Sequence, residues 1–237
     1  MKTLAILNCD RIQAKWVEIY GDYPAMFMTL LAPFAEEVEF EIFDVIQGEY
    51  PDAIDDVDGY LITGSRYSAY EQEPWIVRLG QFVEKLNSAR KPLLGVCFGH
   101  QIIARALGGK VEKASVGWEV GRVEYPIHVQ TASMPSCKRN FSLLVSHQDQ
   151  VVTLPENAEV LAGYARCPIA AYRLDRHILC IQGHPEFTLA YCRELILKRY
   201  DLIGASKADA ALATLDIVHD GEWVAEWMMQ FLRSCWR

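Results

Sequence analysis

Short apolar runs that alternate with helix-like stretches constrain this chain more than any other feature of its sequence. The expected strands are residues 3–7, 38–45, 58–63 and 92–96, and the expected helices are residues 24–35 and 74–87. In 38–45, apolar residues alternate with Glu, which is typical of an exposed or edge strand. Strands and helices in this order predict an α/β fold, with a mostly parallel sheet covered on both faces.

The second half of the chain has a shorter, more strand-like period. The expected strands are residues 120–125, 141–145, 160–164, 169–174 and 177–181, and helices are expected at 189–200 and near the C-terminus. Residues 131–139, with Pro135 and several small side chains, indicate a surface loop. Trp223, Trp227 and Phe231 repeat every four residues, which favours a core or subunit contact over a binding site. Because no linker interrupts the 237 residues, we expect one domain over 1–237.

Composition narrows the possible partners. The formal net charge of −8 and the lack of a Lys/Arg-rich run argue against nucleic-acid binding. The apolar runs are shorter than the roughly 20 residues of a membrane helix, and no signal-peptide pattern opens the chain, so we expect a cytoplasmic protein without a membrane partner. Seven cysteines without a CxxC pair indicate neither a disulfide framework nor a zinc ribbon.

The segment from Pro92 to Gln101 predicts a nucleophile turn. It reads PLLGVCFGHQ, so that Cys97 stands between a buried strand and a helix, flanked by Gly95 and Gly99. Glycines at this spacing allow a tight strand-to-helix turn, and the helix start favours a thiolate and a nearby oxyanion. Taken alone, the pattern fits a small buried thiol equally well. A metal site using Cys97 and His100 is disfavoured, because no second pair of ligands lies at a suitable spacing.

A second segment, GHPEF at residues 183–187, follows another apolar strand. Pro185 favours an extended His184, so the side chains of His184 and Glu186 point to the same side. The carboxylate can then orient the imidazole toward a nucleophile, and with Cys97 this predicts a Cys-His-Glu triad. The alternative is a loop histidine followed by an acidic residue at a helix start. Both segments follow apolar strands, whose carboxyl ends gather at one edge of a parallel sheet, and this favours the triad.

Residues 92–103 and the GHPE segment resemble the two signatures of class I glutamine amidotransferases. The resemblance runs from the first strand to the helix after Glu186. It implies a flavodoxin-like fold, in which additional antiparallel strands accompany a mostly parallel central sheet flanked by helices. It also implies a Cys97 thioester formed from a γ-glutamyl substrate. No metal or organic cofactor is implied.

The same resemblance implies further site residues. Gly64 occupies the position of the family's oxyanion-loop glycine, so its backbone N–H and that of Phe98 are the expected oxyanion hole. Gln101, Ser65, Ser146 and His147 are the expected substrate-binding residues. Each has a structural alternative: a turn for Gly64, and helix or strand capping for Gln101 and the Ser146 segment. Ser65 replaces a second glycine found in GMP synthase, which makes this loop more similar to stand-alone GMP synthase-like proteins, including γ-glutamyl peptidases.

Three functions follow as hypotheses. The first is hydrolysis of glutamine or a γ-glutamyl amide, with the ammonia passed to a possible synthetase partner. The second is a γ-glutamyl peptidase that needs no partner. The third is a non-catalytic module that binds a γ-glutamyl ligand and regulates another protein. The intact Cys, His and Glu set argues against the third, since binding alone does not need all three side chains.

Overall fold

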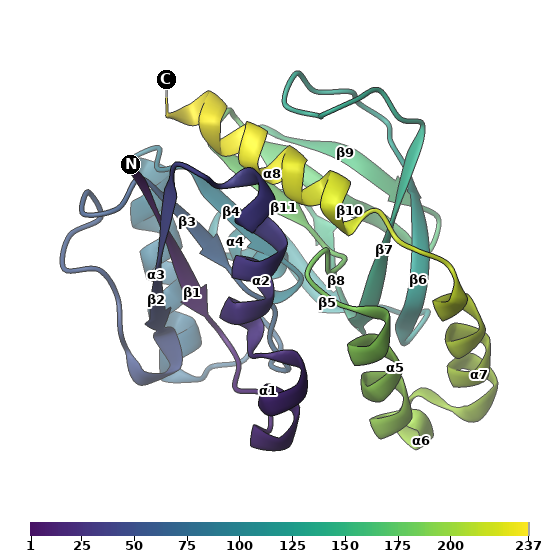
Figure 1. The fold of residues 1–237 in the computed structure, drawn as a ribbon. Coiled ribbons are helices and arrows are strands. Elements are labelled where there is room, and N and C mark those ends of the chain that lie inside the picture. Colours follow the sequence, from purple (N-terminus) through teal and green to yellow (C-terminus); the bar gives the residue numbers. More distant parts are fainter. Residues whose placement is uncertain (237) are drawn as a thin grey trace.

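A central seven-stranded sheet organises the molecule, seen in a computed structural model that describes residues 1–236 (Figure 1). The strand order is β2-β1-β3-β4-β11-β10-β9. The strands are β1 (Lys2–Asn8), β2 (Val38–Asp44), β3 (Gly59–Ile62), β4 (Leu93–Val96), β9 (Ala158–Tyr164), β10 (Cys167–Leu174) and β11 (Ile178–Ile181). Pairing is parallel from β2 to β11 and antiparallel from β11 to β9. The predicted α/β fold with a mostly parallel sheet and additional antiparallel strands is confirmed.

Helices cover both faces of this sheet, as its sequence pattern requires. The helices on the two faces are α2 (Tyr23–Leu31) and α8 (Gly221–Cys235) on one side, and α3 (Pro74–Ser88) and α4 (Phe98–Ala106) on the other. Side chains of β1 alternate between them: Leu4 and Ile6 join the core under α8, and Ala5 and Leu7 join the core under α3. Because both faces are buried, β1 reads as a continuous apolar run.

Local sequence explains where two of the helices begin. Asp22 caps α2 by accepting a hydrogen bond from the Ala25 N–H (2.9 Å), and Pro24 lies in the first turn, where its missing N–H costs nothing. Thr188 caps α5 (Leu189–Lys198) in the same way, accepting from the Tyr191 N–H (3.1 Å).

The C-terminal aromatic stripe lies in α8, where Trp227 is fully buried in the core. The core interpretation of that stripe is therefore confirmed for Trp227.

Two small antiparallel sheets and a group of helices complete the fold. Strand β5 (Lys110–Lys113) pairs with β8 (Asp149–Thr153), and β6 (Glu119–Pro126) pairs with β7 (Asn140–His147). Helices α5 and α7 (Ala205–Ala213) pack on β7 and β6, with α6 (Tyr200–Ile203) between them (Figure 1). The segment after β11 is held to β7 by an isolated bridge between His184 and Leu144.

Some elements were not anticipated from the sequence. Helix α1 (Ala14–Tyr20) and strands β5 and β8 are short, and their apolar residues do not form a clear period. Short 3₁₀ turns follow α2, β2 and α7, at Ala32–Phe34, Val45–Gln47 and Thr214–Asp216. The predicted loop at 131–139 is a loop, although its Met134 is buried.

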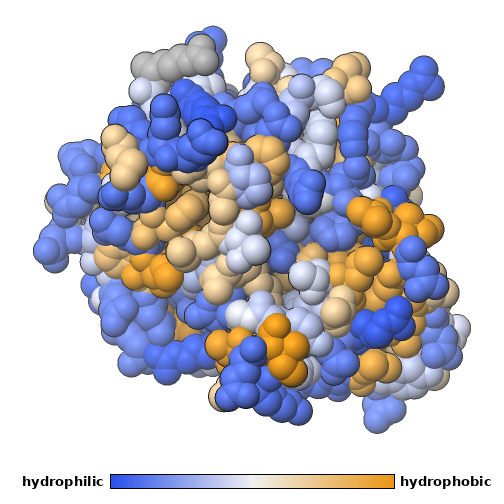
Figure 2. Space-filling view, viewed as in Figure 1, coloured by the Kyte–Doolittle hydropathy of each residue, from blue (hydrophilic) through white to orange (hydrophobic). Residues whose placement is uncertain are grey.

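The face seen in Figure 2 has mixed hydropathy, with hydrophobic side chains at the right of the view and at its bottom, near α1, among hydrophilic ones. Helix α1 exposes Val17 and Ile19. Within residues 1–236, no helix is both long and apolar enough to cross a bilayer.

Candidate active site

Cys97 and the His184 segment are brought together by the pairing of β4 with β11. These strands are parallel neighbours, with Val96 opposite Ile181, so the residues that follow each strand start side by side. The Cys97 N–H donates a hydrogen bond to the Ile181 carbonyl (2.9 Å), which continues the pairing by one step. The expectation that both segments end at one sheet edge is confirmed.

Cys97 forms a strained turn between β4 and α4. Its backbone has φ 52° and ψ −101°, a region that non-glycine residues rarely occupy and that costs roughly 1–3 kcal/mol. Glycines on both sides make the turn possible. A Cβ on Gly99 would lie 2.3 Å from the Ile62 carbonyl oxygen, and one on Gly95 would lie 2.8 Å from the Gly99 backbone. The tight packing therefore needs hydrogen at both positions, as the sequence indicated.

His184 is held on several sides. Its Nδ1 lies 2.7 Å from Oε1 of Glu186, and its backbone N–H donates to the Leu144 carbonyl (2.8 Å). The Phe187 ring stacks on the imidazole, with centroids 3.8 Å apart and planes 10° apart. Cys97 lies near the imidazole, because a Cβ on Gly64 would lie within 4 Å of both Cys97 and His184. His184 therefore contacts Glu186 and lies near Cys97.

Electrostatics at this cluster favour a charged imidazole. His184 and Glu186 are both buried, and burial alone would lower the pKa of His184. The charges of Glu186 and Cys97 outweigh burial and raise the pKa of His184 to about 10. A histidine whose pKa is raised is a stronger base, and nucleophilic catalysis by a thiol needs a base beside it.

The loop after β3 brings Gly64 against the cysteine and histidine. A Cβ on Gly64 would lie 2.7 Å from Cε1 of His184 and 3.7 Å from Cβ of Cys97. Among residues 1–236, neither the Gly64 N–H nor the Phe98 N–H donates a hydrogen bond to another residue. Two free backbone donors near a nucleophile suit the binding of an oxyanion.

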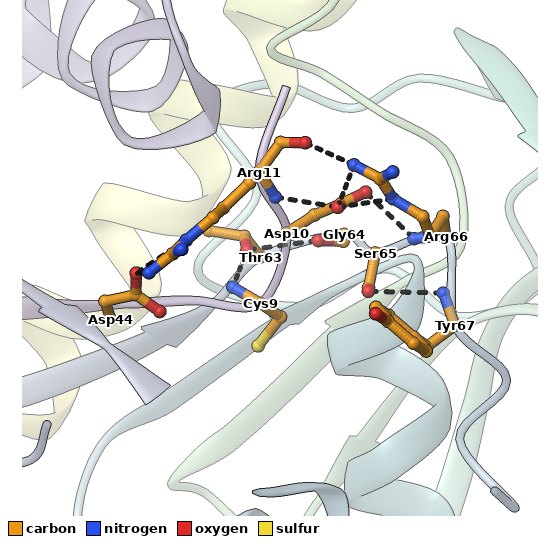
Figure 3. A network of polar contacts seen from close by, with 9 residues as sticks. All are labelled: Cys9, Asp10, Arg11, Asp44, Thr63, Gly64, Ser65, Arg66 and Tyr67. Carbon is orange, nitrogen blue, oxygen red and sulfur yellow. Dashed lines mark hydrogen bonds and ion pairs between the residues drawn. The ribbon is translucent and has the colours of Figure 1, made fainter. Parts of the chain in front are cut away.

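A polar network centred on Asp10 fixes this loop to the end of β1 (Figure 3). The buried Asp10 carboxylate accepts hydrogen bonds from the Arg66 N–H (3.0 Å), the Arg66 Nε (2.7 Å) and the Arg11 N–H (2.7 Å). The Thr63 hydroxyl accepts from the Cys9 N–H (3.0 Å) and donates to the Gly64 carbonyl (3.1 Å). Asp10 was not among the predicted site residues, although its position shortly after the buried strand β1 was an available signal.

A pocket of about 300 Å³ opens beside Cys97. All four predicted substrate-binding residues line it: Ser65, Gln101, Ser146 and His147. The Gln101 amide donates to the Asp149 carbonyl (2.8 Å) and to Oε1 of Gln182 (3.2 Å), so its side chain is fixed from two strand ends. Strand β8 thus places Asp149 at the pocket, where its carboxylate accepts from the Tyr70 hydroxyl (3.1 Å).

His147 is neutral. Burial and the nearby charge of His184 lower the pKa of His147 to about 3. Its Nδ1 lies 3.2 Å from the Asp149 carbonyl, which requires a proton on Nδ1. With so low a pKa, His147 is a poor general base at neutral pH.

Further pocket residues come from outside the two signatures. Arg199 follows α5, lines the pocket and donates to the Ser146 hydroxyl (2.7 Å). Tyr67 and Tyr70 also line it, whereas Trp75 packs into the core against Phe98. No local sequence motif predicts that Arg199 lines the pocket, because its position depends on how α5 packs on β7.

Metal ligands do not gather anywhere in residues 1–236: no group of three or more His, Cys, Asp or Glu side chains is placed to hold an ion. The seven cysteines are all free thiols.

Known proteins are similar to this chain in sequence and in fold. A family model described as glutamine amidotransferase class-I matches residues 36–200. Gamma-glutamyl peptidase 3 of Arabidopsis thaliana is 33% identical over 224 residues, which cover 90% of this chain and 88% of that protein. Gamma-glutamyl peptidase 4 of the same plant is 38% identical over 176 residues, covering 71% and 69%. The crystal structure of a glutamine amido transferase from Methylobacillus flagellatus superposes with a TM-score of 0.77 at 21% identity, over 100% of this chain and 94% of the other.

Proposed function

Because the chain belongs to the class I glutamine amidotransferase family, we propose that it hydrolyses the γ-glutamyl amide bond of glutamine or a γ-glutamyl compound through a thioester on Cys97. One observation carries the proposal. Nδ1 of the His184 imidazole is bound to Glu186, and Cys97 lies near the same imidazole at the end of the neighbouring strand. This is the arrangement in which a histidine moves a proton between a nucleophile and a leaving group.

In the first half of the reaction, His184 takes the Cys97 proton and the thiolate attacks the γ-carbonyl carbon. The oxyanion that forms is bound by the backbone N–H groups of Gly64 and Phe98. The C–N bond then breaks as His184 gives its proton to the departing nitrogen, which leaves as ammonia or an amine. A γ-glutamyl thioester remains on Cys97.

In the second half, water enters the pocket and His184 removes one of its protons. The resulting hydroxide attacks the thioester carbonyl through a second oxyanion, and glutamate leaves as His184 returns the proton to the Cys97 sulfur. Glu186 stabilises the imidazolium in both halves. Gln101, Ser65, Ser146 and His147 line the space beside Cys97 and would bind the γ-glutamyl group.

A peptidase activity is the second candidate, supported by the relatives named gamma-glutamyl peptidases. In that case the leaving group is the amine of an amino acid or peptide, and no partner is needed. A glutaminase would instead pass ammonia to a synthetase partner. We also propose that these reactions take place in the cytoplasm.

Product release from the purified protein tests these proposals. Glutamine and γ-glutamyl dipeptides are supplied, and ammonia and glutamate are measured for the wild type and for Cys97→Ala. Cys137→Ala is the matched control, because Cys137 is exposed and far from the elbow in sequence. Glutamate from dipeptides, lost only in Cys97→Ala, supports the peptidase; ammonia from glutamine alone supports the glutaminase.

Two results would contradict the catalytic proposal. Turnover that survives Cys97→Ala would exclude the thioester. Binding of a γ-glutamyl ligand without any product or covalent mass increase on Cys97 would support the non-catalytic module instead.

A further inference from the structure

Arg199 is a cation held in place beside the nucleophile. It follows the last turn of α5, and its guanidinium donates to the Ser146 hydroxyl (2.7 Å). The same guanidinium lies over the Trp118 ring, 5.4 Å from its centroid. Arg199, Ser146 and Trp118 all line the pocket that contains Cys97. Stacking and a hydrogen bond together restrict the side chain and leave most of its five N–H donors free.

Within residues 1–236, no carboxylate forms an ion pair with Arg199, so no carboxylate of the described residues neutralises its charge. Arg66, which also lines the pocket, differs because its guanidinium is bound by Asp10. An arginine without a protein carboxylate, in a site that binds small molecules, is suited to a carboxylate of the ligand.

Other cations gather near Arg199. Lys113 also lines the pocket, and partial burial together with the charges of Arg199 and Arg66 lowers the pKa of Lys198. This local positive charge is opposite in sign to the formal net charge of the whole chain, which is −8. In the pocket lining, Lys113 and Arg199 outnumber the one carboxylate, Asp149, and Arg66 is paired with Asp10, so the local charge favours anionic substrates.

We propose that Arg199 binds a carboxylate of the substrate in the Cys97 pocket and thereby sets substrate specificity. The inference rests on the proposed function, since the substrate is a γ-glutamyl compound. Two carboxylates have the required chemistry: the α-carboxylate of the glutamyl group, and the C-terminal carboxylate of a peptide leaving group. Glutamine has only the first, and a γ-glutamyl dipeptide has both.

Steady-state kinetics of Arg199→Met test the proposal with three substrates: glutamine, a γ-glutamyl dipeptide, and the same dipeptide with its C-terminus amidated. Loss of a charge-assisted hydrogen bond should lower kcat/KM by roughly 10- to 100-fold, mainly through KM, because the contact is remote from the reacting carbonyl. Arg199→Lys keeps the charge without the planar fork and should recover part of the loss.

The three substrates separate the two carboxylates. If Arg199 binds the glutamyl α-carboxylate, KM rises by the same factor for every substrate that the wild type hydrolyses. If it binds the carboxylate of the leaving group, Arg199→Met raises KM for the free dipeptide only. Amidation of the dipeptide then raises KM for the wild type but not for Arg199→Met. Either pattern supports the proposal, and unchanged KM values for all substrates overturn it.

Lys198→Met is the matched control. Lys198 is adjacent in sequence and near the same cations, but its ammonium lies over the Trp16 ring (4.7 Å) and not in the pocket. An equal effect of both variants would mean general electrostatic attraction, which contradicts a direct contact.

The proposal can fail independently of the catalytic one. If the wild type turns over no substrate, calorimetric titrations with L-glutamate and with the intact γ-glutamyl dipeptide compare the wild type with Arg199→Met. Binding of either ligand that is weaker in Arg199→Met supports the carboxylate contact. Equal binding of both ligands in the two proteins, or no binding in either protein, overturns it.

Discussion

Gly64 faces His184 so closely that a methyl group on Gly64 would stand 2.7 Å from Cε1 of the imidazole. No real Cβ contact is that short, so either the loop or the imidazole would have to move. The glycine after β3 therefore does more than permit a turn, because it leaves the space in which the histidine meets Cys97.

Gly64→Ala should consequently lower kcat by roughly 100-fold, since displacing a catalytic group by about 1 Å has an effect of that size. Gly80→Ala is the matched control. A Cβ on Gly80 in α3 meets only Ala106, at 3.9 Å, so this change should leave kcat unchanged and raise stability slightly. Equal kcat for Gly64→Ala and the wild type would show that the imidazole is not displaced.

Glu186→Gln should lower kcat/KM by roughly 10²- to 10⁴-fold, because the neutral amide no longer stabilises the imidazolium. It should also move the alkaline limb of the pH profile to lower pH. Burial lowers the pKa of His184, and the charge of Glu186 is the main cause that raises it to about 10, so the pKa falls when that charge is removed. Profiles of kcat/KM against pH for both proteins provide the measurement. A coincident alkaline limb in the variant would contradict the assignment of that limb to His184.

The same pair also affects stability. The pKa of His184 in the folded protein lies above its ordinary value of 6.5, so its contribution to the free energy of unfolding is fully present below pH 6.5. That contribution is lost as the pH rises through about 10. Glu186→Gln should reduce this pH dependence in urea unfolding experiments between those limits.

Asp10→Asn tests whether the network in Figure 3 positions the oxyanion loop. The amide nitrogen of Asn cannot accept a hydrogen bond, so one of the two contacts to Arg66 is lost. We expect kcat to fall by about tenfold, with little change in KM. This loss is smaller than the roughly 10²- to 10³-fold fall in kcat that follows removal of an oxyanion-hole donor. Asp44→Asn is the control, since Asp44 binds Arg11 but does not contact residues 64–67. An equal loss in both variants would indicate a general effect on folding.

Trp227→Ala tests the core under α8. The Trp227 side chain is fully buried, and removing it should lower the free energy of unfolding by roughly 3–5 kcal/mol. Trp223→Ala should cost clearly less, because Trp223 is only partly buried at the edge of the same core. Urea unfolding of both variants gives the comparison, and a smaller loss for Trp227 than for Trp223 would contradict the packing described.

Much of the site could be predicted from local sequence. The apolar strand, the flanking glycines and Cys97 are contiguous, so the turn depends on neighbouring residues alone. The same holds for His184 and Glu186, whose spacing and intervening proline bring Nδ1 and Oε1 to 2.7 Å. The single domain over 1–237 and the roles of the site residues stay predictions.

The sequence by itself determined the strands and helices of the parallel sheet, the elbow and the His-Glu pair, because each depends on residues close together in the chain. Tertiary structure alone decided that Asp10 holds the loop at Arg66 and that Arg199 enters the pocket. These contacts join segments more than fifty residues apart. Their formation depends on which strands pair and how α5 packs on β7, and periodicity records which face of an element is buried but not what lies opposite it.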